Sequence, residues 1–197
     1  MLAISHAATA LLVKRRYPEA RMGWILLAAE LPAIAWVGLG FAGIEGAGMG
    51  MPYSHSVVSL LLAAAVAWLL VGRLLRRRAL GAAAALAIVL HLLLDLALHA
   101  QQLPFAPFGE LRLGLGLHAA PPLAIAAATA YGLACWLVFG GGKGLLAVIV
   151  LLTMAQLTFA APLAVDIAVA IACVWYFSRA RAAELEHPSR RLARAFA

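Results

Sequence analysis

Residues 79–100 read ALGAAAALAIVLHLLLDLALHA, and this apolar run begins directly after the arginine cluster at 76–78. The run is long enough to cross a bilayer, because a membrane-spanning helix needs about 20 apolar residues. It nevertheless contains three ionisable side chains, His91, Asp95 and His99. An apolar run of this length with a few ionisable groups is typical of a transmembrane helix that contributes to a functional site.

The rest of the chain has the same character. Of its 197 residues, 65% are hydrophobic and only 12% are charged, and the mean hydropathy is +0.98. A soluble domain has about 25% charged residues, because water must wet its surface. Within lipid the backbone must pair with itself, which leaves helices or a closed barrel, and the apolar runs here are continuous rather than alternating. The composition therefore predicts an all-α, polytopic transmembrane helical bundle.

We expect about seven spans, forming one domain over residues 1–178, followed by a basic tail at 179–197 that extends the last helix along the membrane surface. The first apolar run is short, and the last two could form a single helix bent at Pro162, which would reduce the count to six. The runs lie at 2–13, 22–44, 54–72, 79–100, 117–139, 145–160 and 163–178.

Basic residues alternate along the chain between one set of loops and the other. The connections near 14–21 and 73–78, the loop at Lys143 and the tail are basic, whereas the other connections contain few Lys or Arg residues. This alternation predicts an outside N-terminus and a cytoplasmic C-terminus. It also explains the net charge of +7 by membrane anchoring, so we expect no nucleic-acid binding.

The polar residues of the run at 79–100 follow the helical repeat. His91, Asp95 and His99 are spaced i, i+4 and i+8, so they lie on one face of the helix. Since this span leads outwards from the arginine cluster, His99 is predicted near the outer surface and His91 near the middle of the membrane.

The remaining spans offer further ligands at the same end. His6, His55 and His118 lie at the outer starts of the first, third and fifth spans, and Asp166 lies at the outer start of the last. Imidazoles and a carboxylate that converge in an apolar pocket suit a divalent metal such as zinc, which activates water for hydrolysis. The ligands predicted for this metal are His6, His55, His91, Asp95 and His99.

Two other interpretations remain open. The same groups can join helices by hydrogen bonds, with Ser54, Ser56 and Ser59 as partners, in a scaffold without catalytic activity. They can also form the proton path of a small permease that includes Glu30, which is followed by Pro32 in the second span. In a hydrolase, Glu30 is instead a further ligand or the candidate general base.

The polar motifs resemble those of a known family. Ser5-His6, Ser54-His55-Ser56, His91-Leu-Leu-Leu-Asp95-Leu-Ala-Leu-His99 and Leu113-Gly-Leu-Gly-Leu117 are similar to segments of the YdjM-like group, also called LexA-binding, inner-membrane-associated, metal-dependent hydrolases. The resemblance covers roughly residues 1 to 140. It implies a multi-pass protein of the bacterial inner (cytoplasmic) membrane that binds a metal through the matching His and Asp positions.

The chain departs from this family at two places. Ala33 replaces an expected aspartate, for which Glu30 is the candidate substitute one helical turn away, and Gln101 and Gln102 replace an acidic residue. These departures favour the scaffold interpretation. Our leading hypothesis is a metal-dependent hydrolase, with a divalent ion such as zinc, that acts near the outer face on a lipid-like substrate drawn from the surrounding membrane lipids. The sequence leaves the substrate, the identity of the metal and the oligomeric state undetermined.

Overall fold

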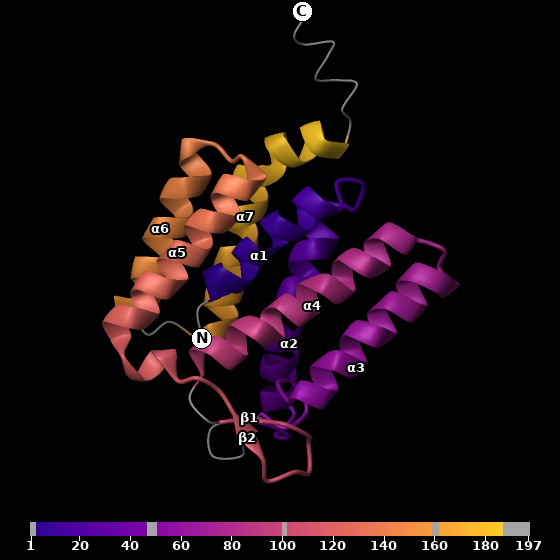
Figure 1. The fold of residues 1–197 in the computed structure, drawn as a ribbon, viewed down its shortest axis with the longest axis vertical. Coiled ribbons are helices and arrows are strands. Elements are labelled where there is room, and N and C mark those ends of the chain that lie inside the picture. The colour runs from indigo at the N-terminus through magenta and orange to yellow at the C-terminus, as the bar shows by residue number, and fades with distance from the viewer. Residues whose placement is uncertain (1–2, 47–50, 100–101, 159–161, 187–197) are drawn as a thin grey trace, which may run out of the picture.

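The computed structural model describes residues 3–46, 51–99, 102–158 and 162–186 (Figure 1). A π-helical segment, η1 (Trp68–Leu74), continues α3, and a 3-10 turn, η2 (Leu117–Ala119), precedes α5. Strands β1 (Leu103–Pro104) and β2 (Arg112–Leu113) pair in antiparallel fashion. The helices are α1 (Ala3–Arg16), α2 (Met22–Phe41), α3 (Val57–Ala67), α4 (Arg78–Leu98), α5 (Pro121–Phe139), α6 (Lys143–Thr158) and α7 (Leu163–Glu186).

Five helical segments are long and apolar enough to cross a membrane. They are Met22–Phe41, Val57–Leu74, Arg78–Leu98, Pro122–Phe139 and Leu163–Glu186. Their outward side chains include large hydrophobic residues such as Leu61 and Leu62, which suit lipid rather than water. The structure therefore supports the predicted helical membrane protein, and the hairpin of β1 and β2 is a small exception to its all-α character.

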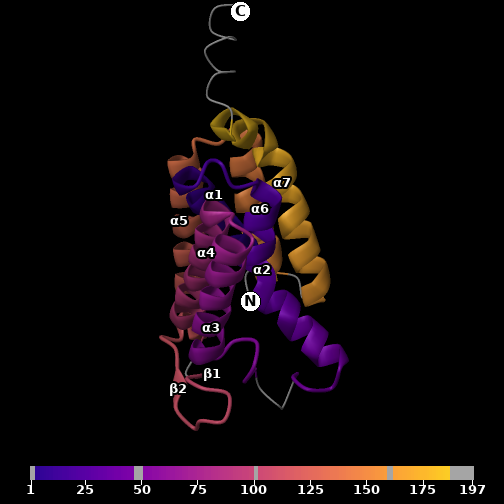
Figure 2. The same ribbon diagram turned by 90° about the vertical axis from the view of Figure 1, so that its right-hand side faces the viewer.

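The two remaining helices are shorter. At 1.5 Å per residue, the 14 residues of α1 extend about 21 Å and the 16 residues of α6 about 24 Å, against about 30 Å of hydrocarbon. The last two apolar runs form separate helices, α6 and α7, which pack side by side in opposite directions (Figures 1 and 2). The alternative of one helix bent at Pro162 is therefore wrong.

The two ends of the bundle differ in chemistry. The α1–α2, α3–α4 and α5–α6 connections lie at one end, where α7 also finishes, and the hairpin of β1 and β2 lies at the other (Figure 1). Because the first group of connections contains the basic clusters, we call it the basic end, and we call the opposite end the hairpin end. The loops that the sequence predicts to be basic thus lie together at one end of the bundle, away from the hairpin at the other end.

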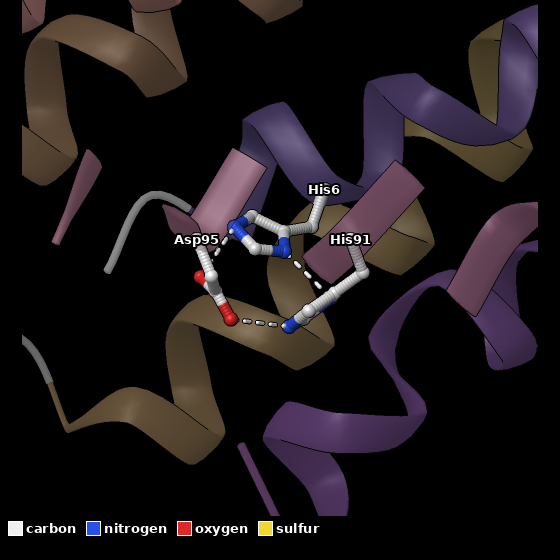
Figure 3. Close-up of side chains that lie close together, drawn as sticks. All are labelled: His6, His91 and Asp95. Carbon is white, nitrogen blue, oxygen red and sulfur yellow. Dashed lines mark hydrogen bonds and ion pairs between the residues drawn. The ribbon is translucent and has the colours of Figure 1, made fainter. Parts of the chain in front are cut away.

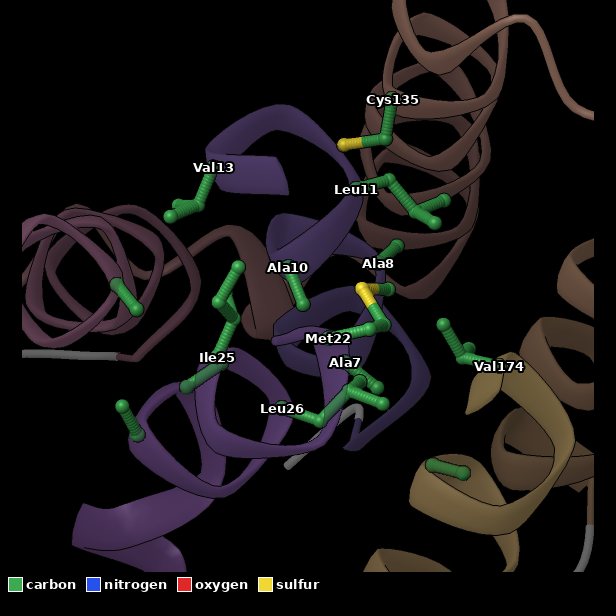
Figure 4. Close-up of a cluster of buried hydrophobic side chains, with 14 of the residues drawn as sticks. Ala7, Ala8, Ala10, Leu11, Val13, Met22, Ile25, Leu26, Cys135 and Val174 are labelled. Atoms are coloured by element: carbon green, nitrogen blue, oxygen red, sulfur yellow. The ribbon is translucent and has the colours of Figure 1, made fainter. Parts of the chain in front are cut away.

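Helix α1 occupies the centre of the bundle although it is the shortest helix after α3. Eleven of its 14 residues are buried, and it packs against α2, α4, α5, α6 and α7. Figure 4 shows Ala7, Ala8, Ala10 and Leu11 surrounded by side chains from α2, α5 and α7. Small alanine side chains allow the neighbouring helices to approach closely, which is how helices associate within lipid.

A buried lysine anchors α1 at the basic end. The side chain of Lys14 is fully buried, yet its Nζ donates to the carbonyl oxygens of Pro18 and Ala20 at 2.6 and 2.8 Å. It also donates to Glu186 Oε1 at 2.7 Å, at the end of α7. These three acceptors satisfy the ammonium group, so Lys14 connects the α1–α2 turn to α7.

Local sequence explains several helix boundaries. The Ser56 hydroxyl accepts from Ser59 N at 3.2 Å and caps α3, which therefore begins at Val57 rather than at 54 as predicted. Helix α5 ends at Phe139, and Gly140 follows it with a φ of 73°, the left-handed conformation that glycine adopts readily. Helix α4 ends at Leu98, so His99 lies just beyond the helix rather than within it.

The α3–α4 hairpin has a close backbone contact that requires a glycine at position 81. A Cβ atom placed on Gly81 of α4 would lie 2.6 Å from the Cα atom of Gly72 in η1, far inside van der Waals contact. The absence of a side chain at Gly81 therefore permits the two backbones to approach at the basic end, whereas a Cβ on Gly72 would make an ordinary contact of 3.7 Å with Gly81.

We expect Gly81→Ala to lower the thermal stability of the purified protein, because the added methyl group meets backbone that cannot rotate away. Overpacking of this kind costs about 1–3 kcal/mol. Gly38→Ala is the matched control, because a Cβ there has no neighbour within 4 Å. Thermal unfolding in detergent, followed by helical circular dichroism, measures both variants, and equal midpoints would contradict the proposed contact.

Candidate metal centre

Asp95 is the centre of a cluster of histidines. It lies one turn after His91 on α4, and His91 Nε2 is 3.1 Å from Asp95 Oδ2. The i, i+4 spacing places both side chains on the same face, as the sequence predicts. Figure 3 shows this pair together with His6, which approaches from α1.

Two histidines reach the carboxylate from other parts of the chain. His6 Nε2 lies 3.5 Å from Asp95 Oδ1, and the central position of α1 brings it there. His55 precedes the first turn of α3, and its Nε2 lies 3.6 Å from Asp95 Oδ2. The predicted convergence of His6, His55, His91 and Asp95 is therefore present in the structure.

His99 belongs to the same cluster although it lies outside the helix. Its backbone is extended, and its Nε2 is 3.5 Å from Asp95 Oδ1. The side chain of His99 is 15% exposed, whereas that of Asp95 is 1% exposed. The cluster is consequently closest to the surface at His99, beside the loop of the hairpin end.

Contacts on the far side of the rings orient the imidazoles. His91 Nδ1 lies 2.6 Å from the carbonyl oxygen of Ala29 on α2, so this nitrogen donates its proton and Nε2 faces Asp95 without one in the neutral ring. His55 Nδ1 lies 2.8 Å from Ser54 Oγ. Histidines that bind metals typically have such a partner on the other ring nitrogen.

His6 differs from the other histidines. Its Nδ1 lies 2.6 Å from His91 Nδ1, and only one proton fits between these two nitrogens. Because His91 Nδ1 donates its proton to the Ala29 carbonyl, His6 Nδ1 is the nitrogen without a proton. The proton of the neutral His6 ring is then on Nε2, which faces Asp95. This arrangement suits His6 to orient the carboxylate.

The loop that contains His55 is attached by a buried carboxylate. Glu45 Oε1 accepts from the backbone N–H groups of Tyr53 and Ser54, the latter at 2.9 Å. After His55 in the chain, Val58 N donates to Phe105 O at 3.0 Å, and this bond connects the start of α3 to the hairpin. These bonds hold His55 at its place beside Asp95.

The cluster is strongly buried and rich in unused donor atoms. Among the described residues, Asp95 forms ion pairs with histidines alone, without a Lys or Arg partner. Within the described part of the chain, the buried Nε2 atoms of His6 and His55 lack a hydrogen bond, whereas His91 and His99 interact with the carboxylate itself. An ionised Asp95 in this position requires either a protonated imidazole or a bound metal, because a buried negative charge needs a compensating cation.

The spacing of the donor atoms fits a metal ion. Tetrahedral zinc with ligand distances near 2.1 Å has ligand atoms about 3.4 Å apart. The distances of 3.1 and 3.6 Å from Asp95 Oδ2 to His91 and His55 bracket that value. Among the described residues, the group whose ligand atoms all lie within 4.8 Å of one another is His6, His91 and Asp95; His55 reaches Asp95 but does not belong to this group. Neutral imidazole and carboxylate are ligands that zinc accepts.

Glu30 lies next to the cluster in sequence and in space. It follows Ala29, whose carbonyl contacts His91, and it is near enough to Asp95 for the two carboxylates to repel each other. Its side chain is fully buried, and among the described residues the backbone of Ala7 on α1 is the group that interacts with its carboxylate, without a side-chain partner. Ala33, the position of the expected aspartate, is buried one turn away.

Some of the predicted residues do not take part in the cluster as described. Asp166 begins α7 and makes no ion pair with the cluster among the described residues. Ser56 and Ser59 bond to each other at 2.7 Å rather than to a histidine. The side chain of His118 lies outside what the structure describes.

Sequence reasoning missed two contributors. Glu45 is the single charged residue of its loop, which was a signal of a specific role, but its bonds to Tyr53 and Ser54 depend on the folded loop. The Ala29 carbonyl left no signal, because any residue supplies a carbonyl oxygen.

The comparisons with known proteins found no match: no protein-family model, no curated protein and no solved structure is similar to this chain. The geometry of the cluster is therefore the basis for any functional assignment.

We expect Ser54→Ala to lower the affinity for zinc by about 10- to 100-fold, because His55 loses the partner that orients its ring. Ser59→Ala is the control in the same segment, since its hydroxyl bonds to Ser56 and not to His55. Titration against a chelator of known affinity measures both variants. Equal affinities would show that Ser54 does not orient a metal ligand.

Proposed function

We propose that the chain is a metal-dependent hydrolase embedded in the membrane, with zinc as its metal. The proposal depends chiefly on one observation, the convergence of four histidine Nε2 atoms within 3.6 Å of the buried Asp95 carboxylate. His55, His91 and Asp95 are the proposed ligands, and His6 and His99 complete or orient the site.

The unused ligand atoms favour a bound metal over a purely structural role, in which these groups only join helices by hydrogen bonds. A carboxylate that only joins helices needs one protonated imidazole and hydrogen bonds of good geometry. Here several imidazoles surround one carboxylate: His55 Nε2 lies 3.6 Å from it without a hydrogen bond, and the neutral His91 ring presents an Nε2 lone pair to the same group. A metal uses this excess of lone pairs, whereas a scaffold leaves it unsatisfied.

Zinc in such a site would act as a Lewis acid and would lower the pKa of water to near neutral, which is the chemistry that hydrolysis needs. The protein's own residues orient the ligands, supply negative charge and accept a proton. Ala29 and Ser54 hold the rings of His91 and His55 in place, and Asp95 supplies a negative charge. The Glu30 carboxylate, buried on α2 beside the cluster, is the proposed general base that accepts a proton from water.

The place of the site suggests a lipid-like substrate. The cluster is buried within the bundle at its hairpin end and is most exposed at His99. The neighbouring loop has exposed apolar side chains, including Phe108, Leu111 and Leu115. An ester, amide or phosphoester with apolar chains can approach such a surface from the membrane.

The permease alternative is less well supported. Between the cluster and the basic end, α1 presents Thr9, which bonds to Tyr131 at 2.8 Å, and then a packed apolar core. A proton path needs polar groups or water along its whole length. The buried residues that follow along α1 are mainly apolar, Ala10, Leu11 and Val13, up to Lys14, whose three acceptors satisfy it.

We expect about one zinc, or another transition metal, per chain purified in mild detergent, measured by elemental mass spectrometry. The double variant His91→Ala/Asp95→Ala should lose it, because two of the ligands are removed. Asp166→Ala is the control, since it removes a carboxylate of the same kind outside the cluster. A wild-type protein without metal after reconstitution with zinc would overturn the proposal.

The catalytic part of the proposal has a separate test on the same preparations. Glu30→Gln should retain the metal but lose about 10²- to 10⁴-fold in hydrolysis of lipid esters, amides or phosphoesters, because the proton acceptor is removed. A wild-type protein that binds zinc but cleaves no member of this panel would leave a metal site without the proposed activity.

We also propose seven crossings in a bacterial inner membrane, with the N-terminus outside and the C-terminus in the cytoplasm. The collection of basic loops at one end supports this orientation, since such loops remain cytoplasmic. Helices α1 and α6 are short, but the bundle surrounds α1, so its ends need not reach the lipid headgroups.

Cysteine labelling tests the orientation. In a background without Cys135 and Cys173, we expect Glu110→Cys to react with a membrane-impermeant maleimide in intact cells. Lys143→Cys should react only after permeabilisation, because it lies at the basic end. Both residues are exposed, so access in the folded protein does not limit either reaction. The reverse pattern would show the opposite orientation.

A further inference from the structure

A second site lies at the basic end, at the opposite end of the bundle from the histidine cluster. A groove of about 590 Å³ opens between α2 and α7. Its walls combine arginine and tryptophan side chains at the end of the bundle with apolar side chains one turn further in. The residues concerned are Arg21, Trp24, Leu27, Ile171, Trp175 and Arg179.

The groove has an excess of positive charge. Among the described residues, neither Arg21 nor Arg179 has an ion-pair partner, and Arg179 lies over the ring of Tyr176 with its Cζ 4.1 Å from the centroid. Glu186 is the carboxylate that lines the groove, but it accepts from Lys14 Nζ at 2.7 Å. Two guanidinium groups therefore remain available to an anion.

The tryptophans place the groove at the level of the lipid headgroups. Trp24 and Trp175 are 52% and 47% exposed, and tryptophan with an apolar ring and a polar N–H is enriched at membrane–water interfaces. Leu27 lies one turn beyond Trp24, and Ile171 one turn before Trp175, both towards the middle of the membrane. The groove thus changes from cationic to apolar along its length, as a phospholipid changes from phosphate to acyl chain.

We propose that this groove binds an anionic phospholipid of the adjacent leaflet. Its phosphate lies between Arg21 and Arg179, and an acyl chain lies against Leu27 and Ile171. Basic pockets between transmembrane helices bind anionic headgroups in this way. A small soluble phosphate would use the arginines but leave the apolar wall exposed to lipid, so the whole groove fits a lipid better. This proposal does not depend on the metal site.

Native mass spectrometry of the full chain in detergent tests the proposal, with phosphatidylglycerol as the anionic lipid and phosphatidylcholine as the neutral one. We expect the wild-type protein to prefer phosphatidylglycerol, and Arg21→Gln/Arg179→Gln to weaken its binding by about tenfold or more, since each basic group contributes about fivefold. The control Arg73→Gln/Lys143→Gln removes two charges at the same end but outside the groove, and it should bind as the wild type does.

Further variants and a competition experiment distinguish a specific lipid site from misfolding and from general surface charge. Arg21→Lys/Arg179→Lys retains the charges and should retain most of the binding, and equal thermal midpoints show that all variants are folded. An equal loss in the Arg73/Lys143 control would overturn the proposal, because surface charge alone would explain the binding. Equal affinity for both lipids, or displacement of phosphatidylglycerol by glycerol phosphate at matching concentration, would also overturn it.

Discussion

The burial of Asp95 is the constraint on which the rest of the hairpin end depends. A carboxylate within an apolar bundle is stable only when a cation or several donors compensate its charge, and the described structure offers it imidazoles alone. Those imidazoles come from three separate parts of the chain. The position of α1, the turn before α3 and the end of α4 are therefore coupled through one side chain.

Helix α1 connects the chemistry of the two ends. Its first turns place His6 beside Asp95, and its last turn places Lys14 beside Glu186 of α7. Between them, alanines allow α2, α4, α5 and α7 to pack closely around the helix. A helix too short to reach both surfaces of the bilayer by itself can remain there because protein, rather than lipid, surrounds it.

The two proposed sites use the membrane differently. The histidine cluster lies inside the bundle, where low polarity strengthens interactions between a cation and its ligands. The groove of Arg21 and Arg179 lies on the surface, where tryptophans meet the headgroup region. Their separation at opposite ends of the bundle means that a lipid in the groove can hold α2 against α7 without approaching Asp95. Because Ala29 and Glu30 belong to α2, the placement of that helix also determines what surrounds His91.

The sequence by itself determined the helical membrane class, the basic character of one set of loops and the shared face of His91 and Asp95. These features follow from composition and from the helical repeat, which are local properties. Only the tertiary structure decided that His6 and His55 reach the same carboxylate and that Glu45 holds the loop before α3. It also decided that His99 joins from beyond the end of its helix. Contacts between distant segments depend on which helix faces pack together, and a continuously apolar run does not specify its packing face.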